Sequence, residues 1–96
     1  MPAAIYLPEA RDDIDAVYAG YEAQVPGLGE RFLAALARTV AAVEGNPYLY
    51  GEVAAGVRAG PLRRFPFVVY YKPLGSVLVI AIRHGQDDPA VWQGRA

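Results

Sequence analysis

The first half of the chain carries the hydrophobic period of two helices. Between Pro8 and Pro26, apolar residues recur at the i, i+3, i+4, i+7 spacing of an amphipathic helix, at Ile14, Val17, Tyr18 and Tyr21. Proline suits the first position of a helix, and the residue before a proline disfavours helix, so this helix is expected to end before Pro26. A second stripe runs from residues 27–29 to the Gly-Asn-Pro stop at 45–47. The short joint predicts an antiparallel αα-hairpin.

The remaining elements carry the period of strands. Residues 3–7 are short, apolar and β-capable, and predict a first strand. After Pro47, residues 51–55 predict a weak strand, 56–60 a turn, and 62–65 and 67–72 two strands separated by Pro66. A turn at 73–76 leads to 77–82, which is apolar on both faces and is therefore expected at the centre of the sheet. The polar tail, 85–96, predicts irregular structure or one short helical turn.

This order of elements predicts an α+β fold, with an N-terminal strand and a helical hairpin packed on an antiparallel β-sheet. Ninety-six residues suit a single domain, 1–96, and a hydrophobic fraction of 54% argues against disorder. No apolar run reaches the ~20 residues of a membrane helix, and no signal peptide opens the chain. The absence of cysteine excludes disulfides and thiolate metal sites and suits a reducing compartment. We expect a cytoplasmic protein without a metal or other cofactor.

Charge is distributed unevenly along the chain. Residues 1–48 contain seven acidic and three basic residues, a balance of −4, and residues 49–96 contain three acidic and six basic residues, a balance of +3. Such asymmetry either marks a charged partner or reflects solvated faces. The acids Glu9, Asp12, Asp13 and Asp15 open the first helix and are expected to be surface residues that match its dipole.

The basic residues of the predicted sheet are the main candidates for binding. Arg64, Lys72 and Arg83 together could hold a phosphate or carboxylate, whereas strand alternation would point Arg63 away from Arg64. The single histidine, His84, is either a general acid or base near neutral pH or a hydrogen-bonded residue that closes the strand. Trp92 in the tail is either a lid packed over the sheet or an exposed anchor.

Five local features, in order, resemble the RelE/ParE superfamily of toxins from bacterial type II toxin–antitoxin systems, often described as plasmid stabilisation proteins. The resemblance covers nearly the whole chain. The features are Leu-Pro-Glu-Ala at 7–10, Val-Pro-Gly-Leu-Gly-Glu-Arg-Phe-Leu at 25–33, Asn-Pro at 46–47, Leu-Arg-Arg-Phe-Pro-Phe-Val-Val-Tyr-Tyr at 62–71, and His-Gly-Gln-Asp-Asp-Pro-Ala-Val-Trp at 84–92. The resemblance implies a helical hairpin on a twisted antiparallel sheet. It also implies a cognate antitoxin whose C-terminal segment wraps and neutralises the toxin.

Two activities divide the superfamily. RelE-like members cleave messenger RNA in the ribosome, which would give Arg64 and Arg83 the role of stabilising the scissile phosphate and His84 that of acid–base catalyst. ParE-like members poison DNA gyrase and are not known to be nucleases. The basic residues usual after His-Gly in the family are replaced here by Gln86 and Asp87. The net charge is −1, whereas a ribosome binder is expected to be basic.

These departures favour the ParE-like branch, a gyrase inhibitor rather than an enzyme, with no sequence-specific DNA contact of its own. The expected target-binding residues are Arg63, Arg64, Lys72, Arg83, Trp92 and Arg95. An mRNA endoribonuclease and a non-toxic protein that only binds antitoxin remain open alternatives. A converging patch of Arg64, Lys72, Arg83 and His84 would favour the nuclease, exposed apolar residues near Trp92 the gyrase inhibitor, and a well-packed tail without a growth effect the binding partner.

Overall fold

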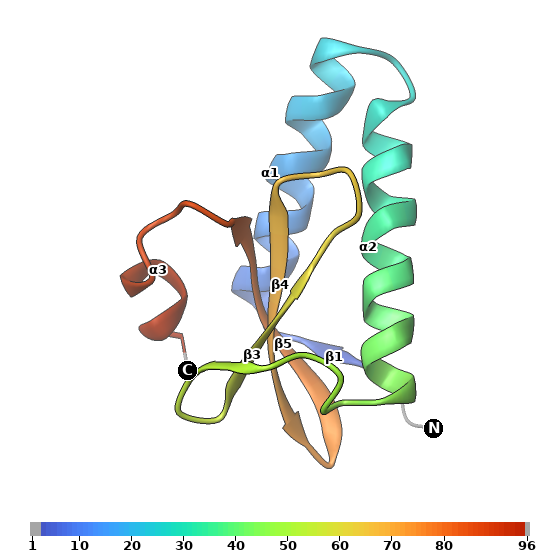
Figure 1. The fold of residues 1–96 in the computed structure, drawn as a ribbon. Coiled ribbons are helices and arrows are strands. Elements are labelled where there is room, and N and C mark those ends of the chain that lie inside the picture. Colours follow the sequence, from blue (N-terminus) through green and yellow to red (C-terminus); the bar gives the residue numbers. More distant parts are fainter. Residues whose placement is uncertain (1–2, 96) are drawn as a thin grey trace.

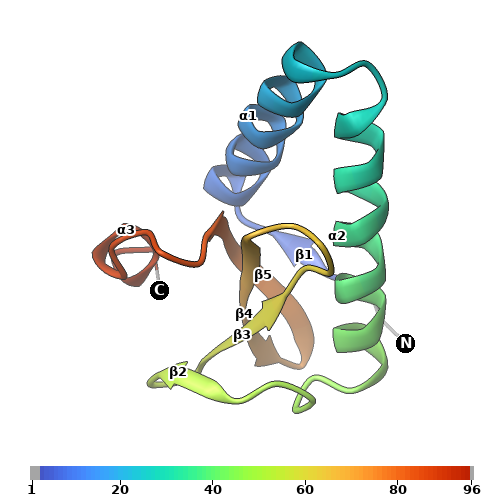
Figure 2. The ribbon, with the colours of Figure 1, turned by 45° about the horizontal axis from the view of Figure 1, so that its top comes forward.

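The computed structural model describes residues 3–95, so Ala96 of the predicted tail lies outside the described residues. A helical hairpin lies against one face of a five-stranded sheet, and a short C-terminal helix covers part of the other face (Figures 1 and 2). The elements in chain order are β1 (Ile5–Tyr6), α1 (Pro8–Gln24), α2 (Leu28–Gly45), β2 (Glu52–Ala54), β3 (Val57–Pro61), β4 (Phe67–Leu74), β5 (Ser76–His84) and α3 (Ala90–Gln93). The predicted α+β class is confirmed.

The sheet has the strand order β1-β5-β4-β3-β2. β2 to β5 pair antiparallel, as predicted, but β1 pairs parallel to β5 and so makes the sheet mixed. β1 reaches only Leu78 and Val79, because the chain enters α1 at Pro8. β5 lies between β1 and β4, the internal position predicted for residues 77–82. Beyond Val79, however, its β1-side edge has no strand partner within the described residues.

The hairpin joint is closed by a side chain of α1. The Glu22 carboxylate accepts the backbone N–H groups of Gly27 at 2.9 Å and Gly29 at 2.8 Å. These donors open α2, whose first amides have no intrahelical partner. Gly27 adopts a φ of +89°, a left-handed conformation that favours glycine. Glu22 therefore supplies the cap that the N-terminus of α2 lacks in its own sequence.

The segment from residue 56 to 66 differs from the prediction. A turn was expected at residues 56–60, but residues 57–61 form β3. Residues 62–65, expected to be a strand, form the turn between β3 and β4. The Leu62 N–H donates to the Phe67 carbonyl at 3.0 Å across this turn, and Arg64 adopts a φ of +67°. The predicted turn at 73–76 shrinks to a tight hairpin around Gly75, since residues 73, 74 and 76 belong to the strands.

The sheet separates two hydrophobic clusters. The cluster under the hairpin is centred on Phe32, Leu36 and Val43 from α2 with Val69 and Tyr71 from β4. The smaller cluster on the other face joins Tyr70, Ile80 and Ala81 to Trp92. The pairing of β4 with β5 shifts between Tyr70 and Tyr71 and skips Ile80, so the consecutive residues Ile80 and Ala81 of β5 both belong to this smaller cluster. This bulge exchanges the faces of the residues that follow it.

Burial of tyrosine predicts sensitivity to alkaline pH. Burial raises the pKa of Tyr71 above the ordinary value of 10.0, and it does the same for Tyr6, Tyr21 and Tyr70. A pKa raised in the folded state gives stabilisation that is complete below the unfolded pKa and is lost as pH rises through the folded one. We therefore expect the urea midpoint to fall only as pH rises above the ordinary tyrosine pKa of 10.0, in step with the absorbance of tyrosinate.

The variant Tyr71→Phe separates this effect from general alkaline damage. The Tyr71 hydroxyl donates to the Pro47 carbonyl at 2.9 Å, so the variant should lose about 1 kcal/mol at neutral pH. The difference from wild type should then shrink as pH rises. The control is Tyr48→Phe, at an exposed side chain. A constant difference between Tyr71→Phe and wild type across the whole range would contradict the assignment.

Candidate functional site

A buried carboxylate connects α1, β5 and the C-terminal tail. Asp13 Oδ2 accepts the N–H of Ile82 at 3.0 Å and Nη1 of Arg95 at 2.6 Å, and Oδ1 accepts Nη2 of Arg95 at 3.3 Å. The Asp13 side chain is only 6% exposed, so the prediction of a surface acid is wrong for this residue. Its position follows from the short β1, which leaves the Ile82 N–H open at the sheet edge. The carboxylate satisfies that donor in place of a strand.

Asp13 also determines the state of two predicted target-binding arginines. Its hydrogen bond raises the pKa of the Arg95 guanidinium, which keeps that side chain charged at any physiological pH. Arg83 Nη1 lies 3.4 Å from Asp13 Oδ1, and its Nε donates to Asp87 Oδ2 at 3.0 Å. Arg83 therefore has a carboxylate on each side. Asp87, one of the two residues that depart from the family pattern, contributes one of them.

Trp92 is a lid and not an exposed anchor. Its side chain is 3% exposed and stacks on Tyr70, with ring centroids 4.5 Å apart and an interplanar angle of 15°. α3 holds it there, over the face of the sheet opposite the hairpin. The lid alternative is confirmed. The expectation that Trp92 contacts a target needs correction, because the ring is not accessible while the tail is packed.

His84 lies on the hairpin side of the sheet, away from Arg83. Its Nδ1 accepts the backbone N–H of Gln86 at 3.1 Å, and its ring meets Phe67 edge-on at 5.7 Å. The histidine lines a hollow of about 440 Å³ whose walls are otherwise mostly apolar, together with Ala16, Val17, Gly20, Tyr21, Gln24, Pro66 and Phe67. This environment matches the hydrogen-bonded histidine that closes a strand.

The structure does not bring Arg64, Lys72 and Arg83 together. Lys72 pairs in register with Leu78 and Arg83 with Val68, so the two cations stand four positions apart along β4. Arg64 belongs to the turn before β4 and faces α2. The predicted three-cation phosphate site is therefore wrong as a grouping, because residues 62–65 are not the strand that would have aligned Arg64 with the sheet.

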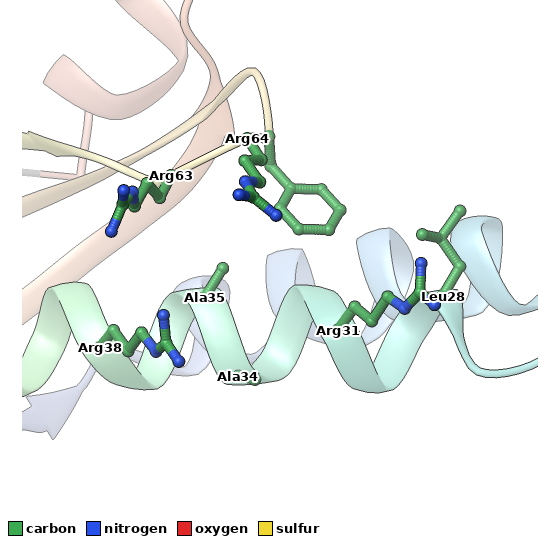
Figure 3. A pocket seen from close by; sticks show the side chains of 8 residues that line it. Leu28, Arg31, Ala34, Ala35, Arg38, Arg63 and Arg64 are labelled. Carbon is green, nitrogen blue, oxygen red and sulfur yellow. The ribbon is translucent and has the colours of Figure 1, made fainter.

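Arg63 and Arg64 instead share a cleft with two arginines of α2 (Figure 3). The expectation that Arg63 and Arg64 point to opposite faces fails, since alternation applies to strands and not to this turn. The cleft has a volume of about 480 Å³ and is lined by Leu28, Arg31, Ala34, Ala35, Arg38, Arg63, Arg64 and Phe65. Arg31 and Arg38 were not among the predicted site residues. Their spacing of seven on one helix, off the apolar stripe, is the signal that could have found them.

Within residues 3–95, no group of three or more His, Asp or Glu side chains is placed to hold a metal ion. None of the helices in this range is both long and apolar enough to cross a bilayer.

The architecture is that of a small α+β protein with a helical hairpin on one sheet face, and comparison with known proteins places it in a family. Residues 4–89 match the family model described as the ParE toxin of the type II toxin–antitoxin system parDE, and the chain belongs to this family. A solved structure titled "Chromosomal ParDE TA system from P. aeruginosa" has the same fold, with a TM-score of 0.76 and 20% sequence identity. The match covers 88% of this chain and 96% of that one. No curated protein sequence matches the chain.

Proposed function

We propose that this ParE-family toxin inhibits DNA gyrase by binding it, without catalysing a reaction, and that a cognate antitoxin neutralises it in the bacterial cytoplasm. Membership of the ParE family supports the gyrase target. The main support for a non-enzymatic mechanism is that the three residues that a nuclease would use lie in different environments. Arg83 is held by Asp13 and Asp87, Arg64 lies in the cleft on α2, and His84 faces a mostly apolar hollow.

General acid–base catalysis needs the proton-transfer group within hydrogen-bond reach of the reacting atoms. His84 lines one hollow and Arg64 a different one, and the two lining sets share no residue. A scissile phosphate bound by Arg64 in its cleft would therefore lie in a different hollow from the one that the imidazole lines. This separation argues against ribonuclease chemistry built on these three residues.

The test is pulse labelling of DNA and protein synthesis after induction of the full chain, followed by a supercoiling assay with purified gyrase. We expect DNA synthesis to fall first and gyrase to be inhibited. The variant His84→Gln should be as toxic as wild type, because within residues 3–95 the imidazole makes one hydrogen bond, from the Gln86 N–H, and one ring contact, with Phe67. A nuclease that used His84 would instead lose about 100-fold or more in activity.

Two results would reject the proposal. An early fall in protein synthesis that His84→Gln abolishes would establish the ribonuclease alternative. Unchanged synthesis of both polymers, with folded protein accumulating, would leave a non-toxic antitoxin-binding partner. A non-toxic antitoxin-binding protein was expected to combine a well-packed tail with no effect on growth, and the buried Trp92 already meets the first of these conditions. In that case Gln86 and Asp87 are the first positions at which to restore basic residues.

A further inference from the structure

Four of the eight arginines line one cleft, and they are the four without a partner. Within residues 3–95, no hydrogen bond, ion pair or ring contact is found for the side chains of Arg31, Arg38, Arg63 and Arg64. All four are exposed. They come from separate parts of the chain, two from α2 and two from the β3–β4 turn (Figure 3).

Each of the other four arginines has a partner inside the protein. The Arg11 guanidinium lies 5.3 Å from the centre of the Tyr6 ring. Arg58 donates to the Tyr50 carbonyl at 2.6 Å. Arg83 and Arg95 bind Asp13. The eight arginines thus divide evenly, and all four that have no partner within residues 3–95 line this one cleft.

No acidic side chain lines the cleft to balance the charge of its four arginines. None of its eight lining residues is acidic, although the whole protein carries a net charge of −1. Four like charges around about 480 Å³ repel one another and concentrate anions from solution. A ligand with a single negative charge would compensate only one of the four arginines. The complementary ligand is therefore one that carries several negative charges.

The spacing of the arginines favours an extended ligand. Arg31 and Arg38 are two helical turns apart, about 10.5 Å along α2. Guanidinium groups match phosphate oxygens in paired hydrogen bonds, which makes arginine the preferred residue for phosphate recognition. Leu28, Ala35 and Phe65 add apolar surface beside the charges, against which a sugar or base could pack.

The backbone of Arg64 gives a second indication that this cleft is a binding site. Its φ of +67° is the left-handed conformation that non-glycine residues seldom adopt. It is the one such non-glycine residue among residues 3–95. Strained backbone conformations of this kind cluster at active sites and ligand-binding sites, where the strain is part of the function. Here the conformation puts Arg64 and Arg63 in the same cleft.

We propose that the cleft formed by Arg31, Arg38, Arg63 and Arg64 binds a row of phosphate groups. Either an oligophosphate chain or a single strand of nucleic acid supplies this chemistry. The site is separate from the His84 hollow and does not depend on gyrase being the target. Binding rests on charge and phosphate geometry, and it requires no base-specific contact.

The test measures binding of sodium tripolyphosphate and of a fluorescent (dT)8 oligonucleotide to the full chain at low salt. We expect at least one probe to bind, and Arg31→Gln and Arg64→Gly each to weaken it about tenfold. Each should also lower the slope of log K against log salt by about one. Glycine accepts the φ of residue 64 without strain, so Arg64→Gly removes the charge while preserving the turn.

The matched control is Arg11→Gln, which makes the same change in net charge on α1, outside the cleft. It should leave binding unchanged. Binding of tripolyphosphate alone would identify an oligophosphate site, and binding of (dT)8 alone a nucleic-acid site. The proposal is overturned if neither probe binds wild type, or if Arg11→Gln weakens binding as much as the cleft variants. An octaglutamate peptide that binds where both phosphate probes fail would overturn the phosphate assignment as well.

Discussion

The variant Asp13→Ala is expected to lose about 3–5 kcal/mol of unfolding free energy, because it removes one side of a buried charge network. The Ile82 N–H loses its acceptor, and the Arg95 guanidinium, whose side chain is only 16% exposed, loses its carboxylate and keeps only the Ile80 carbonyl at 3.3 Å. Urea unfolding measures the loss. Trp92 fluorescence reports the tail directly, since Arg95 lies three residues beyond the indole. The tail signal should therefore change at a lower urea concentration than the helical signal in circular dichroism.

Two companion variants define what Asp13 contributes. Asp13→Asn keeps an oxygen for the Ile82 N–H but loses the charge that binds Arg95, so its loss should be smaller, about 1.5–3 kcal/mol. Asp12→Ala removes the exposed neighbouring acid and should change stability by no more than about 0.5 kcal/mol. If Asp13→Ala and Asp12→Ala behaved alike, the network would contribute nothing to folding.

The role of Asp13 illustrates what the hydrophobic pattern cannot reveal. Local period predicted α1, α2, β4 and β5, since each buries a stripe or face that is continuous in sequence. Asp13 stands between Asp12 and Asp15 near the start of α1, a setting in which an acidic residue is normally solvated. Its burial depends on which donor the sheet leaves open opposite α1. That donor, the Ile82 N–H, is open only because β1 ends after Tyr6.

The turn at 62–65 was missed for a different reason. Leu-Arg-Arg-Phe contains no glycine, proline, asparagine or aspartate, the residues that usually reveal a turn, and Leu62 and Phe65 look like strand residues. Arg64 takes the left-handed conformation that a glycine would normally supply. A sequence rule based on turn residues therefore places β3 too late, and alternation then separates Arg63 from Arg64 when the fold brings them together.

The arginine cleft could not be derived from the charge balance of the two halves. The predicted asymmetry, −4 against +3, suggested that the basic surface belongs to the C-terminal half. The cleft instead takes Arg31 and Arg38 from the acidic half and Arg63 and Arg64 from the basic half. Packing of α2 beside the β3–β4 turn creates the local concentration of charge. The cluster of positive charge therefore results from the tertiary packing of two segments, and the net charge of −1 gives no sign of it.

The second large effect is expected for Phe32→Ala, at the centre of the hairpin-side core. Phe32 is 0% exposed, and its ring centroid lies 5.9 Å from those of Tyr21, Phe65 and Phe67. It therefore connects α2 with α1, the β3–β4 turn and the sheet. Removing the ring leaves a cavity among three other aromatic residues and should cost about 3–5 kcal/mol. Because a domain of this size has about 5–15 kcal/mol in total, much of its stability would be lost.

The same variant links the core to the arginine cleft. Phe65 packs on Phe32 and directly follows Arg64, so a loosened turn should weaken binding of tripolyphosphate or (dT)8 even where the domain remains folded. Urea unfolding gives the stability, and near-ultraviolet circular dichroism reports the order of the aromatic cluster. Val25→Ala, at a side chain 54% exposed in the hairpin joint, is the control and should cost less than about 0.5 kcal/mol. A loss for Phe32→Ala within about 1 kcal/mol of that control would mean that the cluster closes over the missing ring, and that α2 and the turn are held together by contacts other than Phe32.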